Sequence, residues 1–380
     1  MTKWSPLECF TLLGFALVAA NLFGCKPEPK TIILRKAETK AVADVIVRKE
    51  IRSLAFGSCA QAESAMPVLD VAINKKPDVF IWLGDNVYGD TKDIAVLKSQ
   101  YESLKSNPYF QRLDSATRLL ATWDDHDYGW NDAGRHYPLK TESKAVFLDF
   151  WNEPRDSPRR KREGVYISYL FDGGRQDVHV ILLDTRTFRD NLVQSQSLIL
   201  EGSNGFSYMA DYEPHHNPDS TLLGPIQWRW LKKQLAVEAD YRIIASSTQF
   251  GIEWNGYESW ANFPHEQKRM IRLLDEAATN RVSKKSKPVP AIFISGDVHY
   301  AEISKITPST GSALGDIFDV TSSGITSTWD FATSNGNRLA GPIMDNNVGI
   351  LQLGRPGKAE ISAEIWDAAG QLRIEHSVYR

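Results

Sequence analysis

The stretch that decides the fold reads Leu119-Leu-Ala-Thr-Trp-Asp-Asp-His-Asp-Tyr-Gly-Trp-Asn-Asp132. Its apolar start is typical of a buried strand, and it runs directly into Asp-Asp-His-Asp at 124–127 and then Asn-Asp at 131–132. Four carboxylates within nine positions repel one another in a folded site unless cations neutralise them. The stretch therefore predicts one part of a polynuclear metal site at the carboxyl end of a strand. Taken alone, it would be explained more simply as a solvated acidic turn.

Other apolar runs in the chain also end in residues that can bind metals. They are Leu54–Ala60, which presents Cys59; Val79–Asp90, which presents Asp85, Tyr88 and Asp90; Ile243–Gln249, which ends in Gln249; and Ala291–Tyr300, which presents Asp297 and His299. Each residue alone has an ordinary alternative, such as a buried thiol, a helix cap, a packing aromatic or a hydrogen-bonded core histidine. Because functional groups gather beyond the carboxyl ends of strands in α/β sheets, we expect these ends to converge on one site.

Length and composition bound the class of protein. The 380 residues allow one large domain or two ordinary ones, and 42% hydrophobic residues suffice for a sizeable core. The formal net charge of -3 gives no reason to expect nucleic-acid binding. Three cysteines do not form a disulfide framework. No boundary after residue 50 is strong enough to split the chain, so we predict one domain at 51–380.

The N-terminus is predicted to be a targeting segment at 1–25. Lys3 precedes an apolar run at Phe10–Phe23 that is short for a membrane span, and Leu22-Phe-Gly-Cys25 resembles the lipobox of bacterial lipoproteins. We expect acylation at Cys25, which would anchor the protein to a membrane through lipid. Soluble export and an uncleaved anchor are the alternatives. All three place the protein outside the cytoplasm, in the periplasm or at the cell surface, with residues 26–50 as a tether that includes a short strand at Ala43–Val47.

The remaining pattern alternates short β-branched runs with amphipathic stretches, which predicts an α/β (α+β) fold. Strands are expected at 53–56, 79–83, 119–122, 165–171, 178–183, 242–246, 291–295 and 317–321, and helices at 65–74, 93–105, 143–150, 225–235 and 265–278. The last 35 residues are expected to form antiparallel strands around turns at Gly354–Gly357 and Ala368–Gly370.

Together, the strand-end motifs resemble those of the calcineurin-like metallophosphoesterases, and specifically the alkaline phosphatase D family. That family carries Gly-Ser-Cys, Gly-Asp-x-x-Tyr, Trp-Asp-Asp-His and Ser-Gly-Asp-x-His, which match residues 57–59, 84–88, 123–126 and 295–299. The segments at 183–186 and 223–231 are also similar, and the resemblance covers roughly residues 51–375. It implies a metallophosphoesterase domain with two mixed β-sheets packed as a sandwich and flanked by helices.

The resemblance also implies two adjacent metal positions bridged by Asp85. The first position would be held by Cys59, Asp85, Tyr88 and His299, and the second by Asp85, Asp125, Gln249 and Asp297. Thiolate and phenolate are strongly donating anions, which suit Fe(III). The second ligand set is all oxygen, which suits Ca²⁺, with Mn²⁺ or Mg²⁺ as alternatives.

The implied reaction is hydrolysis of a phosphate ester by a metal-bound hydroxide. His126 is then the candidate general acid, and Asp127 is expected to orient it. Asn131 and Arg186 are candidates for holding substrate oxygens, with an ordinary ion pair as the alternative for Arg186. Asp90, Asp124 and Asp132 are left as supporting residues or structural ligands. The segments at 202–218 and 254–263 are candidate walls of the site mouth, or packed surface loops.

Three functions remain open at this point. A phosphomonoesterase of the alkaline phosphatase D type, acting on a small-molecule or lipid phosphate ester, is the first. A phosphodiesterase on the same fold, acting on phospholipid or nucleotide diesters, is the second. The third is a non-catalytic surface lipoprotein that binds calcium for structure, which would have no need of Cys59 and Tyr88 beside the carboxylates.

Overall fold

The computed structural model describes residues 41–174, 176–202, 205–283, 286, 288–354 and 361–379. The predicted targeting segment at 1–25, the first part of the tether and most of the turn expected at Gly354–Gly357 lie outside the described residues. Residues 41–50 of the predicted tether are described. They contain strand β1 (Val45–Val47), which pairs with β5 (Ile167–Asp172). The folded region therefore begins inside the range 26–50.

The larger of two main sheets has eight strands in the order β1-β5-β6-β11-β12-β14-β13-β15. Its other strands are β6 (Asp177–Leu182), β11 (Tyr241–Ser246), β12 (Ala291–Ser295), β13 (Ala301–Ile306), β14 (Ile317–Ser322) and β15 (Arg338–Ile343). The central strands β6, β11, β12 and β14 run parallel. At one side β5 pairs antiparallel with β6 and parallel with β1, and at the other side β13 pairs antiparallel with both β14 and β15. The predicted strands of this region are confirmed to within two residues.

The smaller main sheet has six strands in the order β18-β17-β16-β2-β3-β4. They are β2 (Ser53–Gly57), β3 (Val79–Leu83), β4 (Arg118–Thr122), β16 (Asn347–Leu353), β17 (Ile361–Asp367) and β18 (Leu372–Tyr379). The first three are parallel and the last three antiparallel, which confirms the antiparallel C-terminal strands expected from the sequence. Both sheets are thus mixed.

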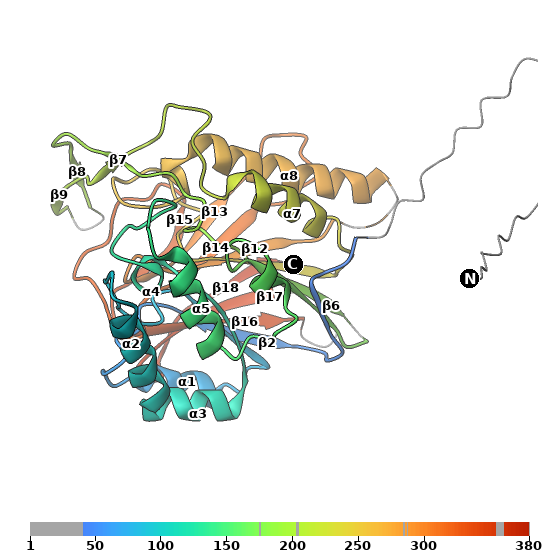
Figure 1. Ribbon diagram of the computed structural model, residues 1–380. Helices are drawn as coiled ribbons and strands as arrows, with labels where there is room; N and C mark the ends of the chain where they lie inside the picture. The colour runs from blue at the N-terminus through green and yellow to red at the C-terminus, as the bar shows by residue number, and fades with distance from the viewer. Residues whose placement is uncertain are drawn as a thin grey trace, which may run out of the picture. The chain divides into compact units, whose positions relative to one another are not determined.

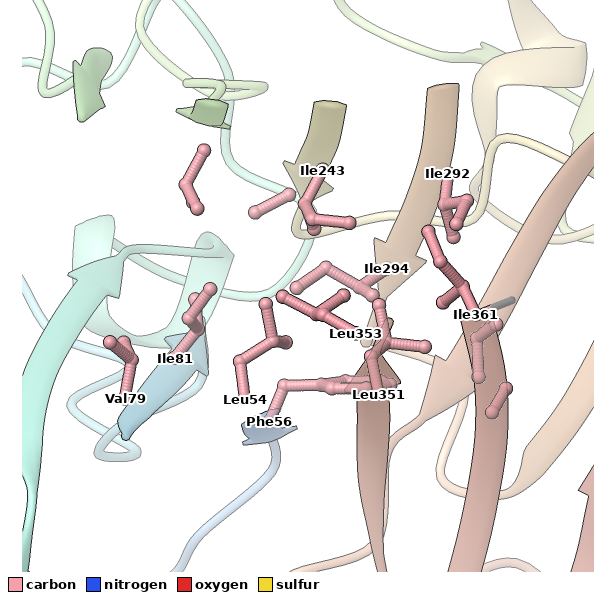
Figure 2. Close-up of a cluster of buried hydrophobic side chains, with 14 of the residues drawn as sticks. Leu54, Phe56, Val79, Ile81, Ile243, Ile292, Ile294, Leu351, Leu353 and Ile361 are labelled. Carbon is pink, nitrogen blue, oxygen red and sulfur yellow. The ribbon is translucent and has the colours of Figure 1, made fainter. Parts of the chain in front are cut away.

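The two sheets pack face to face through alternate residues of their strands. Leu54 and Phe56 of β2 lie in the same buried cluster as Ile243 of β11 and Ile294 of β12 (Figure 2). Ala55, between the two β2 residues, belongs to a different cluster on the outer face. This period of two is what places every second side chain of a strand between the sheets.

Helices cover the outer face of each sheet. Those on the smaller sheet and its loops are α1 (Pro67–Asn74), α2 (Ile94–Ser106), α3 (Pro108–Ala116), α4 (Asp125–Tyr128), α5 (Lys140–Phe150) and α6 (Pro158–Lys161); those on the larger sheet are α7 (Gly224–Gln234) and α8 (Pro264–Ser283), preceded by the 3-10 turn η1 (Trp260–Asn262) (Figure 1). Trp82 of β3 contacts Phe110 of α3 at a ring distance of 5.8 Å, so the helix layer is anchored on the sheet by aromatic packing. The expected sandwich flanked by helices is confirmed.

Two small hairpins lie between β6 and α7. They pair β7 (Val193–Gln194) with β10 (Tyr212–Glu213), and β8 (Ile199–Glu201) with β9 (Ser207–Met209). Figure 1 shows β7, β8 and β9 at the edge of the domain, away from α1 and α3. Among the described residues, no helix combines the length and the apolar character that crossing a membrane requires.

Candidate metal centre

The predicted ligands come together where the carboxyl ends of strands from both sheets meet. Cys59 follows β2, Asp85 follows β3 and Asp125 follows β4 in the smaller sheet, while Gln249 and Asp297 follow β11 and β12 in the larger one. Contacts cross between the sheets: the Cys59 Sγ lies 3.5 Å from Asp85 Oδ2 and 3.7 Å from the carbonyl oxygen of Asp297. The convergence expected from the sequence is confirmed.

Residues of this edge adopt an unusual backbone conformation. Six of them have left-handed φ angles: Cys59 (64°), Asp85 (47°), Asp90 (44°), Asp132 (56°), Asp297 (76°) and His299 (58°). For residues other than glycine this conformation costs roughly 1–3 kcal/mol and persists only where the surroundings fix it. Clustering of such residues is typical of sites where the side chains must point in a required direction.

The first predicted metal position is assembled around a thiol. Single ligand atoms of Cys59, Asp85 and His299 all lie within 4.8 Å of one another. The Tyr88 hydroxyl lies 3.5 Å from His299 Nε2, so the fourth predicted ligand joins the same group. Ser323, which follows β14, supports this group because its hydroxyl lies 3.1 Å from Cys59 Sγ and accepts a hydrogen bond from the His299 N–H.

The second predicted position is a cluster of carboxylates. Ligand atoms of Asp124, Asp125 and Asp297 lie within 4.8 Å of one another, and Asp85 shares a similar group with Asp125. Asp85 therefore lies in groups on both sides, as a bridging ligand must. Asp124, which the sequence left as a supporting residue or a structural ligand, is an additional candidate ligand at this position.

Unpartnered buried oxygens show that the residues fit bound cations. Asp85 Oδ1, Asp124 Oδ2, Asp125 Oδ1 and Gln249 Oε1 are all buried without a hydrogen-bond partner. The Gln249 amide nitrogen donates to Glu302 and Thr321, which leaves its oxygen directed elsewhere. Because an unpaired buried polar atom is costly, four such oxygens in one site are explained best by metal coordination. The described residues thus form a metal-binding site.

The carboxylates of this site are electrostatically strained without cations. Burial, together with Cys59 and Asp125, raises the pKa of Asp85 well above its usual range. Burial, together with Asp124, Glu258 and Asp125, does the same to the pKa of Asp297. Burial also raises the pKa of the Cys59 thiol. Cations that favour the charged forms would reverse these shifts, which is the electrostatic counterpart of the unpartnered oxygens.

His126 has a different partner from the one that the sequence predicted. Its Nδ1 lies 2.6 Å from Asp90 Oδ1, and its ring contacts that of Tyr88 at a centroid distance of 4.4 Å. Burial lowers the pKa of His126, but Asp90, Asp85 and Asp125 outweigh it and raise that pKa to about 10. Asp90 therefore holds the imidazole, and the expectation that Asp127 orients it is wrong.

Asp127 instead fixes the loop that carries the site. One carboxylate oxygen accepts a hydrogen bond of 2.6 Å from the Asp124 N–H, and the other accepts from the Asn86 N–H and the Tyr101 hydroxyl. The reason is local: Asp127 lies in the first turn of α4, from which its side chain folds back to the N-terminus of the helix. In this way it ties the loop after β3 to the loop after β4.

Arg186 lies among buried carboxylates. Its side chain is fully buried; Nε pairs with Asp124, Nη1 lies 2.7 Å from Glu258 and Nη2 lies 3.7 Å from Asp125. The ion-pair alternative describes the observed contacts of Arg186, while its Nη2 has no hydrogen-bond partner, so its role as a substrate contact stays a prediction. Burial raises the pKa of Asp125, but Arg186 and His126 lower it to about 2.

The structure places Asn131 and the two candidate wall segments at the margin of the site. Asn131 is exposed, and its side-chain amide donates to Asp132, so its role as a substrate contact stays a prediction. Asp132 in turn accepts from the Tyr212 hydroxyl of the segment at 202–218. The segment at 254–263 contributes Glu258, whose carboxylate pairs with Arg186 and with Arg189 at 3.0 Å.

Two contributors and one pairing were not predicted. Asp90 was expected to be a supporting residue or a structural ligand, but only the structure shows that it reaches His126. Ser323 follows an expected strand whose polar end, Thr321-Ser-Ser-Gly324, was the available signal. Glu258 had no signal, because it lies in an aromatic loop and its importance depends on Arg186 from a distant segment.

Fold and site together define a class before any family is considered. The fold is similar to that of a dimetal phosphatase from Danio rerio, at a TM-score of 0.51 and 11% identity over 86% of this chain and 98% of that one. A solved structure of PhoD matches with a TM-score of 0.58 and 18% identity over 87% of this chain and 72% of that one. These likenesses show the metallophosphoesterase type of fold.

The particular family follows from the sequence. A family model for the PhoD-like phosphatases matches residues 54–340, and the chain belongs to this family. Alkaline phosphatase D of Bacillus subtilis (strain 168) is 22% identical over 293 residues, which are 67% of this chain. The chain spans about half of the length of that curated relative, 47%. The resemblance noted from the strand-end motifs is confirmed.

Proposed function

We propose that the protein is a metal-dependent phosphoric ester hydrolase, a phosphomonoesterase of the alkaline phosphatase D type. The observation that carries this proposal is the set of buried, unpartnered ligand oxygens at converging strand ends, two positions sharing Asp85. Membership in the PhoD-like phosphatase family supports the same activity. Paired cations supply Lewis acidity: they make water more acidic and offset the charge of phosphoryl oxygens.

We further propose different metals for the two positions. Cys59, Asp85, Tyr88 and His299 combine thiolate, carboxylate, phenolate and imidazole donors, which suit Fe(III). The other position combines only carboxylate and amide oxygens, from Asp85, Asp125, Gln249 and Asp297, with Asp124 as an additional candidate. A hard oxygen set suits Ca²⁺, and Mn²⁺ or Mg²⁺ are the alternatives.

The proton needed by the leaving oxygen is assigned to His126. Its side chain is only 15% exposed and lies in one group with Asp85 and Asp125, close enough to both metal positions to face a bound phosphoryl group. Asp90 accepts from Nδ1, which leaves Nε2 as the atom that donates to the ester oxygen. Asn131 is retained as a proposed contact to a substrate oxygen. Its backbone N–H donates to the same Asp90 oxygen that holds His126, which places Asn131 beside the proposed proton donor.

The substrate proposed is a phosphate ester of a small molecule or lipid, with a diester on the same site as the alternative. Both classes of ester present phosphoryl oxygens, whose charge cations held by this ligand set would offset in either case. Export, with lipid anchoring through Cys25, is proposed from the lipobox-like sequence alone. The non-catalytic calcium-binding alternative is less favoured, because Cys59 and Tyr88 are not ligands that calcium prefers.

One experiment tests the function and its main rivals. The protein is purified after expression with calcium and iron, its metals are counted by elemental analysis, and turnover of p-nitrophenyl phosphate is compared with that of bis(p-nitrophenyl) phosphate. We expect two metals per chain and faster turnover of the monoester. Faster turnover of the diester would establish the phosphodiesterase alternative. Bound calcium with no turnover of either compound would overturn the hydrolase proposal.

A further inference from the structure

A continuous series of aromatic rings extends outward from the metal centre. It consists of Phe206, Tyr208, Tyr257, Trp329 and Phe331, which we call the aromatic wall. Its inner end is Trp329, whose ring stacks on that of His299 at 5.3 Å and whose backbone N–H donates to the His299 carbonyl oxygen. The wall therefore begins one side chain away from a predicted metal ligand.

The wall has a flat inner part. The rings of Trp329 and Phe331 are inclined by only 7° at a centroid distance of 5.3 Å. At that distance parallel rings are offset rather than overlaid, so part of each face stays uncovered by the other. Both side chains, and that of Tyr257 beside them, are partly exposed. Together they present ring surface to whatever enters the site mouth.

The outer part of the wall is fixed by the hairpin β8–β9. Tyr208 is buried, donates a hydrogen bond of 2.6 Å to the Asn255 carbonyl oxygen and stacks on Tyr257. Phe206, which contacts Phe331 at 5.9 Å, is 55% exposed. Tyr208 is thus sufficient to pack the hairpin against the domain. Packing alone does not explain why the rings of Phe331 and Trp329 continue, partly exposed, toward His299.

We propose that the aromatic wall is the leaving-group subsite, and that it selects phosphate esters whose alcohol carries a planar ring such as a nucleobase. This inference rests on the proposed hydrolase function. A phosphoryl group at the metal centre directs its leaving alcohol to one side of the site, and on the His299 side the ring next to the ligand is that of Trp329, followed by that of Phe331. Near-parallel ring planes fit a flat ring, and base–aromatic stacking tolerates different bases because every base has a π-face.

The test compares two substrates with the same reacting bond. Adenosine 5′-monophosphate and ribose 5-phosphate are both primary alkyl phosphates, and they differ in the base; if the enzyme is a diesterase, their methyl diesters replace them. Octyl phosphate serves as a third substrate with an apolar chain and no ring. The wild-type protein is compared with Phe331→Leu, which keeps apolar bulk but removes the flat face, and with Phe331→Trp, which keeps a ring.

We expect the wild-type protein to prefer the nucleotide over the sugar phosphate by about tenfold or more in kcat/KM, the scale of one base–aromatic stack. Phe331→Leu should lose most of this preference through KM while the sugar phosphate is turned over within about twofold of wild type, and Phe331→Trp should retain it. Tyr109→Leu, on α3 with its ring over Arg112, is the matched control for removal of a partly exposed ring and should change neither value.

Equal turnover of nucleotide and sugar phosphate by the wild-type protein, with p-nitrophenyl phosphate still hydrolysed, would overturn the inference and leave the hydrolase function standing. An equal loss on both substrates in Phe331→Leu would also overturn it, because Phe331 would then act on the metal centre. If the wild-type protein prefers octyl phosphate and Phe331→Leu keeps that preference, the inference is overturned, because the wall would then bind an apolar chain and not a planar ring. Absence of turnover on every substrate, despite bound metals, would overturn the hydrolase function and this inference with it.

Discussion

The two halves of the metal centre handle negative charge in different ways. Around Cys59, Asp85 and His299, the described side chains include no arginine or lysine within the group, and burial raises the pKa values of Cys59 and Asp85. Around Asp124 and Asp125, the protein supplies its own cation in the buried Arg186. As a result the pKa of Asp125 is lowered to about 2.

This difference suggests how the centre is built. Among the candidate ligand carboxylates of the second half, only Asp125 has a lowered pKa, since burial raises the pKa of Asp124 to about 7 and also raises that of Asp297. A carboxylate such as Asp125 is charged and held in place before any metal arrives, whereas the buried thiol and the other carboxylates need the metal itself to become charged. We therefore infer that Asp125 is the preformed anchor of its half and that the Cys59 side is completed by its ion. The following predictions test that contrast, beginning with the largest expected effect.

Asp85 belongs to both halves, so its removal should affect both. In Asp85→Asn the shared ligand loses its charge, and we expect loss of metal from both positions and a fall in kcat/KM of more than about a hundredfold, beyond the usual cost of losing a supporting partner. Elemental analysis and steady-state kinetics provide the measurement. Retention of two metals with near-normal activity would show that Asp85 is not the bridging ligand.

Arg186 should matter more for stability than for substrate binding. Arg186→Met leaves Asp124 buried without its cationic partner and leaves Glu258 with Arg189 alone, and breaking a buried pair typically costs about 3–5 kcal/mol of unfolding free energy. Denaturant unfolding measures this loss, and added calcium should recover part of it, because a bound cation replaces the missing charge. A variant of normal stability with only a raised KM would instead favour Arg186 as a substrate contact.

His126 lies between the two halves, and it is expected to act in the chemical step. His126→Ala should keep both metals and lose about a hundredfold in kcat, the usual scale for a proton donor. Asp90→Asn, which keeps the shape of the positioning residue, should give a smaller loss of about tenfold. Asp127→Asn serves as the comparison, since Asp127 fixes the loop. Full activity of His126→Ala, or equal kinetic losses in the two aspartate variants, would contradict these assignments.

The sequence was sufficient where a local pattern determines the structure. Val79–Leu83 is a continuous apolar run followed by Gly84-Asp85, which predicted a buried strand with a ligand at its end. Helix α3 escaped prediction although Asn107 caps it and Pro108 is its first residue, because its apolar positions are few. The candidate ligands could be named from the sequence alone, since each of them lies a few residues beyond the end of a strand.

Roles that depend on distant partners needed the structure. Asp127 is adjacent to His126 in the sequence, yet the helical turn directs its side chain back to Asp124, and the imidazole meets Asp90 from another loop. Arg186 shows the same limit: its motif was visible, but its orientation behind the carboxylates depends on Glu258, 72 residues further along the chain. Sequence order specifies which residues are present at a strand end and leaves open which way each one faces.

The smallest expected effect concerns Asp297, which lies with Asp124 and Asp125. Because burial and its neighbours raise its pKa, its ionised form destabilises the metal-free fold at neutral pH, and Asp297→Asn should raise the melting temperature of metal-stripped protein by roughly 1–3 °C. A raised folded-state pKa means that stability is greater at low pH, so the advantage of the variant should shrink as the pH falls toward the ordinary carboxyl range.

With calcium present, wild type should have the higher melting temperature of the two proteins. The wild-type carboxylate then pairs with the ion, while the amide of Asp297→Asn is a weaker ligand. Calorimetry on metal-free and calcium-loaded samples of both proteins makes the comparison. Cys59→Ser is the matched variant at the position proposed for iron. Calcium should stabilise this variant about as much as it stabilises wild type, because Cys59 is not a ligand of the position proposed for calcium. If Asp297→Asn is less stable than wild type even without metal, the carboxylates are held by the fold alone, and the inferred dependence on cations is wrong.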